Sequence, residues 1–272
     1  MKKLCRIITV NLQKCVCNYG FYLCTIVACM LMFTSTVNTD AKGQEISVID
    51  ICMKQTRFQT YGLTVAEILN VSVSPFLTLF IPILSSIPFV SAYTEERNSN
   101  NKKLAISRIG KNCYYISWWM TAMISGGLAV MLGFMLFSTM MMVLFSFTIE
   151  DVAVFLKLCF GMLLYGTISV LPSFIMSAIS KNKYLICCLP FIVMSFWYTF
   201  LNRYVNELFI QKPIEQAVHI TENISFLYPN NLALVLNEST QPIEILTFYS
   251  ILAFLSYVLF LIIVGRKVDV SE

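Results

Sequence analysis

Six apolar segments, each long enough to cross a lipid bilayer, constrain this chain more than any other feature of its sequence. A helix needs about 20 residues to cross a hydrocarbon core of about 30 Å, and lipid offers the backbone no hydrogen-bond partners, so a crossing segment must be helical. Hydrophobic residues make up 57% of the 272 residues and charged residues only 12%, against about a quarter in soluble domains. The sequence predicts an all-α, polytopic membrane protein with spans at about residues 19–37, 71–93, 114–143, 152–180, 184–201 and 245–264.

The connections between these segments alternate in charge. Lysine and arginine dominate the N-terminus, residues 94–113, residues 181–183 and the C-terminal tail. Acidic residues outnumber basic ones in residues 38–70, 144–151 and 202–244. Because cytosolic connections carry the excess of lysine and arginine, every connection fits six spans with both termini in the cytosol. We therefore expect one membrane domain over residues 1–272, with the long apolar stretch 114–149 forming a single span and an outward extension.

The first 18 residues have the pattern of an amphipathic helix. Leu4, Ile8, Leu12 and Cys15 recur at helical spacing, with basic and polar residues between them, which predicts a helix lying in the membrane interface. Such a helix either anchors the chain near anionic headgroups or docks a cytosolic partner. The apolar segment that follows has the length of a signal peptide as well, but its long polar lead and the charge alternation favour a retained span.

The outer connection at residues 202–244 is long and contains three prolines. Apolar patches at residues 208–210 and 226–236 lie between them. We expect helices here that re-enter the outer leaflet or cap the outer mouth of a pathway.

The sequence contains no motif for catalysis or nucleotide binding. A phosphate-binding loop needs Gly-x-x-x-x-Gly-Lys-Ser/Thr, whereas Gly110-Lys111 is preceded by Ala105 and followed by Asn112. No predicted span contains a histidine or an acidic residue, and the one histidine of the chain is His219, in an outer connection. Metal-assisted or acid–base hydrolysis within the bilayer therefore lacks its ligands and its base. We expect no enzymatic activity, and neither a metal nor a cofactor in this chain.

Lys157 is the one ionisable residue that lies well inside a predicted span. A charge at the bilayer centre costs about 3 kcal/mol on insertion scales. Lys157 lies only about two turns from Asp151, however, so its side chain can reach the outer surface by snorkelling. The alternative is a contact with substrate in an outward-facing pathway.

The connection between the second and third predicted spans, residues 94–112, has a charge pattern of its own. It contains Glu95-Glu96-Arg97, then Ser99, then the pair Lys102-Lys103, and finally Ser107-Arg108. The excess of positive charge that cytosolic connections carry accounts for the lysines, and in that interpretation they form only a solvated face. The same excess does not account for the acidic pair.

This connection, together with six spans and an interfacial N-terminal helix, resembles the permease subunits of ATP-binding-cassette exporters of the second class. In members of this family the second span is typically followed by an acidic pair, then Glu-Arg, then a Ser-Gly turn. A Ser-Arg pair typically lies shortly before the third span. Asn100 stands here where glycine is common, and Ile109 where proline is frequent; asparagine also accepts left-handed backbone angles.

The resemblance implies a permease that forms the membrane pathway and is driven by a separate cytosolic ATPase, which binds the ATP. Its elbow at residues 94–112 would sit in a groove of that ATPase, and two permease copies, identical or different, would surround one pathway. It implies export of a peptide, drug-like or lipid-like substrate across a bacterial plasma membrane, without nucleic acid. The coupling residues would be Glu95, Glu96 and Arg97 for transmission and Lys102, Lys103 and Arg108 for docking. The alternative is a membrane-resident immunity or sensory protein that acts by binding, without an ATPase.

Overall fold

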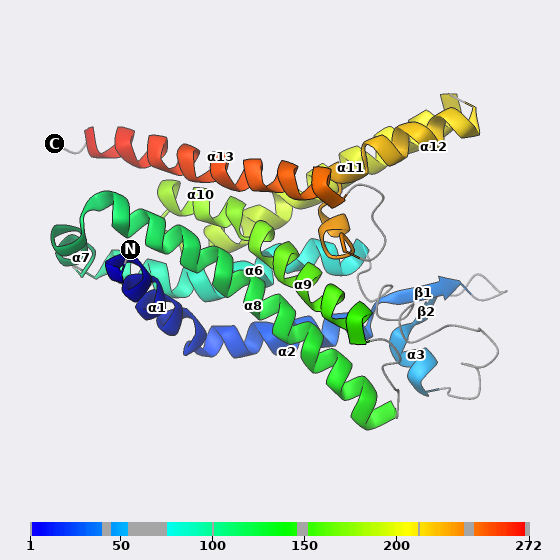
Figure 1. Ribbon diagram of the computed structural model, residues 1–272, viewed down its shortest axis with the longest axis horizontal. Coiled ribbons are helices and arrows are strands. Elements are labelled where there is room, and N and C mark those ends of the chain that lie inside the picture. Colours follow the sequence, from blue (N-terminus) through cyan, green and yellow to red (C-terminus); the bar gives the residue numbers. More distant parts are fainter. Residues whose placement is uncertain are drawn as a thin grey trace.

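The computed structural model describes residues 2–39, 45–53, 75–99, 101–145, 152–211, 213–236 and 242–269. Most of these residues are helical (Figure 1). The first half contains α1 (Lys2–Val16), α2 (Tyr19–Phe33), α3 (Val48–Met53), α6 (Pro75–Asn98), α7 (Asn101–Ile109) and α8 (Lys111–Phe145). The second half contains α9 (Val152–Ser169), α10 (Leu171–Ile179), α11 (Lys183–Gln211), α12 (Ile214–Asn223), the 3₁₀ turns η2 (Ser225–Leu227) and η3 (Pro229–Leu232), and α13 (Pro242–Asp269). Within the described residues, the departure from a helical chain is one antiparallel hairpin of β1 (Thr36–Thr39) and β2 (Glu45–Ser47).

Four helical segments are long and apolar enough to cross a membrane. They are Lys111–Leu144, Val152–Ile179, Lys183–Ile210 and Pro242–Gly265. A fifth span results if α1 and α2, which meet at a bend of 65°, count as one broken span. Helix α6 occupies the second predicted span and ends in the charged turn Thr94–Arg97, and it is not one of the four. This is the helix content of a multi-pass membrane protein.

Three predicted spans differ from the helices that form: the first and the fifth in their bounds, and the fourth by a break inside bounds that are confirmed. The fifth was expected to end at residue 201, but α11 continues to Gln211. The first was expected to reach residue 37, but α2 ends at Phe33 and the chain continues as strand β1 from Thr36. The fourth breaks at Val170 into α9 and α10, because Pro172 in the first turn of α10 has no N–H to donate and clashes with the preceding turn. The third is confirmed as one helix: α8 runs unbroken for 35 residues, about 52 Å.

Helix α8 lies at the centre of the bundle, where it contacts α1, α2, α6 and α9. Small residues let α8 and α9 approach closely. A Cβ atom added at Gly127 would lie 2.7 Å from the carbonyl oxygen of Leu163, and one at Gly166 would lie 2.7 Å from that of Gly126. Such glycine-mediated contacts are typical of helices that pack within membranes, where backbone approach replaces the hydrophobic effect as the source of association.

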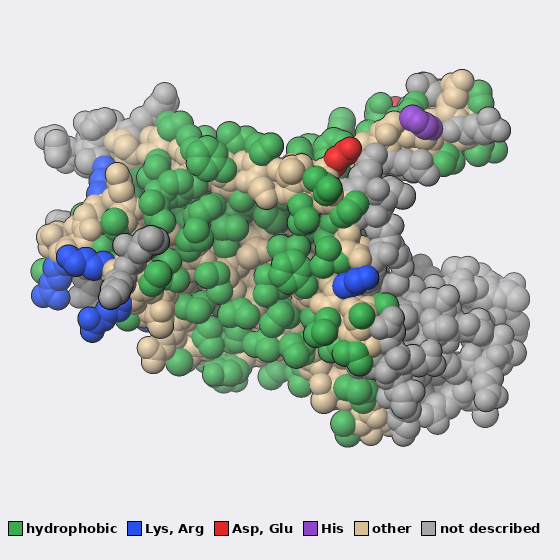
Figure 2. Space-filling model, viewed as in Figure 1, with side chains coloured by type: hydrophobic (Ala, Val, Ile, Leu, Met, Phe, Trp, Pro, Cys, Tyr) green, Lys and Arg blue, Asp and Glu red, His purple; other side chains and the backbone are tan. Residues whose placement is uncertain are grey.

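The two ends of the bundle differ in what they carry. The N-terminus, α7 and the C-terminal end of α13 lie together at one end, which we name the elbow end (Figure 1). The β1–β2 hairpin, α3 and α12 lie at the opposite end, the hairpin end. Lysine and arginine side chains gather at the elbow end, whereas apolar side chains cover the length of the bundle between the two ends (Figure 2). The surface therefore has the apolar belt and basic end expected of a membrane-embedded bundle.

Candidate functional site

The elbow between α6 and α8 is a compact helical corner. Helix α6 closes with a hydrogen bond from the Ser99 backbone N–H to the Glu95 carbonyl at 3.0 Å. Helix α7 then ends at Gly110, whose φ of +89° is the left-handed conformation that favours glycine. The Gly110 N–H donates to the Ile106 carbonyl at 2.9 Å, and the Gly110 carbonyl accepts from the Tyr114 N–H at 3.1 Å. Gly110 thereby forms a tight turn between α7 and α8.

Helix α7 has one face toward the bundle and one toward the outside. Ala105 and Ile106 pack against the apolar core beneath the elbow. On the outer face, Leu104 is 56% exposed, and Ser107 and Arg108 are exposed beside it. Large exposed hydrophobic side chains are common on the long helices of the bundle, and Leu104 is the one that the structure describes on α7.

Lys102 lies on the inner side of α7. Its ammonium group sits over the ring of Tyr115, 5.6 Å from the ring centroid, a cation–π arrangement. Burial lowers the pKa of Lys102 below its ordinary value, and the positive charges of Arg97 and Lys111 lower it further. The placement of the Lys103 side chain lies outside the described residues.

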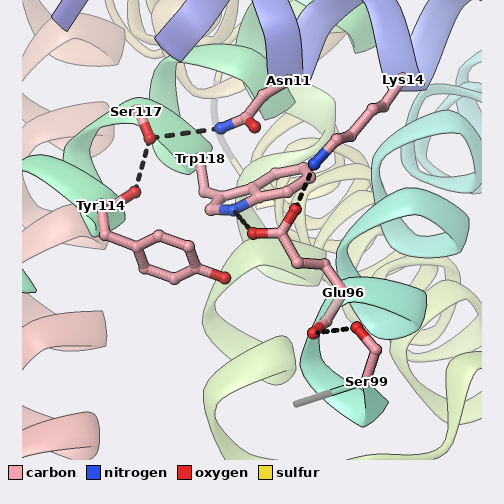
Figure 3. A network of polar contacts seen from close by, with 7 residues as sticks. All are labelled: Asn11, Lys14, Glu96, Ser99, Tyr114, Ser117 and Trp118. Carbon is pink, nitrogen blue, oxygen red and sulfur yellow. Dashed lines mark hydrogen bonds and ion pairs between the residues drawn. The ribbon is translucent and has the colours of Figure 1, made fainter. Parts of the chain in front are cut away.

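Glu96 joins three helices (Figure 3). Its Oε2 atom lies 2.6 Å from Nζ of Lys14 on α1, and its Oε1 atom accepts a hydrogen bond from the indole Nε1 of Trp118 on α8 at 3.3 Å. The Glu96 side chain is only 9% exposed, whereas that of Lys14 is 49% exposed. A second contact between α1 and α8, from the Asn11 amide to the Ser117 hydroxyl at 3.3 Å, lies one turn away.

Arg97 joins α6 to a fourth helix. Its guanidinium donates to the backbone carbonyls of Ser177 and, at 2.8 Å, of Ser180. These carbonyls belong to the C-terminal turn of α10, where the helix leaves its last acceptors without intrahelical partners and carries a partial negative charge. Arg97 therefore closes the end of α10 with both hydrogen bonds and charge.

The six predicted coupling residues thus fall into two groups. Glu96, Arg97 and Lys102 are partly or largely buried and bind other parts of the bundle, whereas Glu95 and Arg108 are exposed; Lys103 is not described. The sequence analysis did not single out Lys14, Trp118 or Leu104. The spacing of Asn11, Lys14 and Cys15 could have indicated that these residues face the same neighbouring helices, because positions i, i+3 and i+4 share one helical face.

Lys157 lies far from this corner, on α9 near the hairpin end. Its side chain is exposed, as are those of Leu156 (60%) and Phe160 (48%), while Leu158 and Met162 on the other face are buried. Lys157 therefore points away from the interior of this chain. A pathway that it lines would have to lie between this chain and another.

The apolar patch at residues 226–236 packs into the bundle at the hairpin end. Leu232, Ala233 and Val235 are each 1% exposed. The Ala233 carbonyl approaches α9 so closely that a Cβ atom at Gly161 would lie 2.0 Å from it. The indole of Trp197 on α11 donates to the Leu227 carbonyl at 3.0 Å. The segment thus ties α9 to α11.

Among the residues that the structure describes, no three His, Cys, Asp or Glu side chains form a group that could hold a metal ion. Comparison of the chain with protein-family models, curated proteins and solved structures gives no match.

Proposed function

We propose that this chain is the permease subunit of an ATP-driven exporter, and that α7 is the contact with a separate ATP-binding-cassette ATPase. The observation that carries the proposal is the outer face of α7. It presents Leu104 with Arg108 beside it, on a short helix at the basic end of the bundle. An exposed apolar anchor with a charged rim is the composition of a protein-binding surface.

The inner contacts of the elbow give this surface a way to move the bundle. Glu96 binds α1 and α8, and Arg97 binds α10. A force on α7 would therefore reach α6 and α8 through the covalent turns, and α1 and α10 through these two side chains. Alternating access needs helices to rock together in this way around a central pathway.

The proposed topology has six spans, with α2 and α6 joining the four long apolar segments. Both termini and α7 lie at one end of the bundle, as six crossings require. The excess of lysine and arginine at that end supports a cytosolic location for it, and the cell membrane of a bacterium is the setting that we propose.

A second permease copy, the same or different, would complete the pathway. The outward direction of Lys157 favours a pathway between two permeases over one within a single chain. The apolar character of the exposed helix faces fits a peptide, drug-like or lipid-like substrate better than a small ion.

The proposal is tested by retention of an ATP-binding-cassette ATPase encoded in the same genome. The tagged chain is co-expressed with that ATPase, solubilised and purified, and the ATPase that remains bound is quantified. We expect the wild-type chain to retain the ATPase and the double variant Leu104→Asp, Arg108→Glu to lose at least about nine-tenths of it. A loss of about 1.4 kcal/mol of binding free energy already weakens the affinity tenfold.

The matched control is Ile214→Asp on α12, which is 73% exposed at the hairpin end and should leave retention unchanged. Equal melting temperatures of all three chains would show that only the contact was lost. A wild-type chain that never retains an ATPase would contradict the proposal and favour an immunity or sensory protein that acts by binding alone.

A further inference from the structure

Three cations lie near one another on the inner side of the elbow. They are Arg97 at the end of α6, Lys102 in the first turn of α7 and Lys111 at the start of α8. Arg97 and Lys111 are close enough to Lys102 for their charges to act on it. In the part of the chain that the structure describes, none of the three forms an ion pair with an acidic side chain. The cluster therefore holds positive charge that no ion pair within the described residues offsets.

Lys102 occupies an unfavourable place for a charged side chain. It is partly buried, and it lies in the first turn of a helix, where the helix dipole is positive and where α7 has no acidic residue. Burial lowers its pKa, and the charges of Arg97 and Lys111 lower it further. Its Nζ atom lies 5.6 Å from the centroid of the Tyr115 ring, which attracts a cation without neutralising it. An anion beside Lys102 would supply the missing negative charge.

An aromatic seam between α8 and α13 leads from this cluster along the bundle. Tyr115 pairs with Phe260 of α13, with ring centroids 5.4 Å apart. One turn further along α8, Trp119 pairs with Tyr257 at 5.3 Å, and both of these rings are partly exposed. Trp119 lies eight residues after Lys111, about 12 Å along the helix. The seam thus places an apolar surface at the depth of acyl chains beneath cations at the depth of headgroups.

We propose that the inner side of the elbow and the seam below it bind an anionic phospholipid of the leaflet at the elbow end. Lys102 and Lys111 hold its phosphate, and the acyl chains lie along the seam. Arg97 donates to α10 through one guanidinium nitrogen, so its other N–H groups can serve the phosphate too. Basic pockets between helices at the cytosolic surface are the usual sites for such headgroups. This site does not depend on an ATPase, because the outer face of α7 stays free.

The test measures the melting temperature of the full chain in maltoside detergent with dioleoyl phosphatidylglycerol or with dioleoyl phosphatidylcholine. The quantity compared is the melting temperature with the anionic lipid minus that with the zwitterionic lipid, taken for each variant separately. A ligand that binds only the folded chain raises its melting temperature, and we expect a difference of at least about 3 °C for the wild-type chain. Lys102→Met should lose at least about half of this difference, whereas Lys102→Arg, which keeps the charge, should retain it.

Arg108→Met is the matched control, because it removes a positive charge from the exposed outer face of the same helix and should keep the full difference. Equal losses for Arg108→Met and Lys102→Met would mean that overall charge attracts the lipid, and the site would be refuted. It is refuted too if the wild-type chain shows no difference, or if millimolar inorganic phosphate raises the melting temperature as much as the anionic lipid does. If Lys102→Met does not fold, Lys111→Gln decides in its place, because Lys111 is exposed and its loss should reduce the difference as well.

Discussion

The guanidinium of Arg97, at the end of α6, donates a hydrogen bond of 2.8 Å to the carbonyl oxygen of Ser180, which is 83 positions later and caps α10. A single arginine thus joins two helices that are distant in the sequence at the end of the bundle where α7 lies. The Ser177 carbonyl accepts from the same nitrogen atom. The contact fixes the position of the elbow relative to the second half of the chain.

Replacing Arg97 should therefore destabilise the fold. Hydrogen bonds from charged donors contribute about 1.5–3 kcal/mol each, so we expect Arg97→Gln to lower the free energy of unfolding by about 2 kcal/mol. The measurement is thermal or denaturant unfolding in detergent. Arg108→Gln is the matched control, because Arg108 is exposed and surface changes usually stay within about 0.5 kcal/mol. Equal losses for the two variants would mean that the Arg97 contacts contribute nothing.

Gly161 should not tolerate a methyl group. A Cβ atom there would lie 2.0 Å from the oxygen and 2.7 Å from the carbon of the Ala233 carbonyl, so the segment at residues 226–236 would have to move away from α9. Overpacking of this kind costs about 1–3 kcal/mol, and we expect Gly161→Ala to lower the free energy of unfolding by that amount.

Gly265 is the matched control for that substitution. It lies on α13 with nothing within 4 Å of the added methyl group, and alanine is a better helix former than glycine. Gly265→Ala should leave the melting temperature unchanged or raise it slightly. If both alanine variants melt alike, the Ala233 carbonyl does not press against α9 in the folded protein.

Lys102 should make the stability of the chain depend on pH. Its pKa in the folded state is lowered, first by burial and then by Arg97 and Lys111, from an ordinary value of 10.5. Below its lowered pKa, Lys102 is charged in both the folded and the unfolded state, and the folded state carries the full cost of that charge. Between the lowered pKa and 10.5 the folded state binds fewer protons than the unfolded state, so the Lys102 contribution to stability rises with pH.

The Lys102→Met variant removes that cost. We expect it to be more stable than the wild-type chain at pH 7, with the difference shrinking as the pH approaches 10.5. The measurement is the melting temperature of both chains between pH 7 and 10.5. Leu104→Met, which changes no titrating group, should differ from the wild-type chain by a constant amount. A Lys102→Met advantage that grows with pH would contradict the lowered pKa.

The helices of the bundle could be predicted from the sequence because lipid leaves the backbone few choices. Hydropathy together with the alternation of charge between connections indicated α8 as one long helix, and it is one. The bounds were less accurate where local chemistry competes with hydropathy. Thr36 and its neighbours are uncharged and looked like the end of a span, but they pair with residues 45–47 as strand β1. Pro172, in the first turn of α10, breaks the fourth predicted span into two helices.

The contacts of the elbow could not be predicted in the same way. Glu96 and Arg97 looked alike in the sequence, as charged residues at a cytosolic turn. Their partners lie 82 positions before Glu96 and up to 83 positions after Arg97. Charge alternation predicts on which side of a membrane a residue lies, but not which helices meet there. Of the acidic pair, Glu95 is exposed whereas the Glu96 side chain is only 9% exposed.

The orientation of the bundle is the last prediction, and the proposed function depends on it. In a chain with its native cysteines replaced, one cysteine is introduced at Leu104 on α7 or at Ile214 on α12, which are both exposed and lie at opposite ends. A membrane-impermeant thiol reagent applied to intact cells should label the Ile214→Cys chain and leave the Leu104→Cys chain unlabelled until the cells are permeabilised. This follows because the elbow end holds the lysine and arginine excess that cytosolic connections carry. The reverse pattern would place α7 outside the cell, out of reach of any cytosolic ATPase, and the exporter proposal would have to be abandoned.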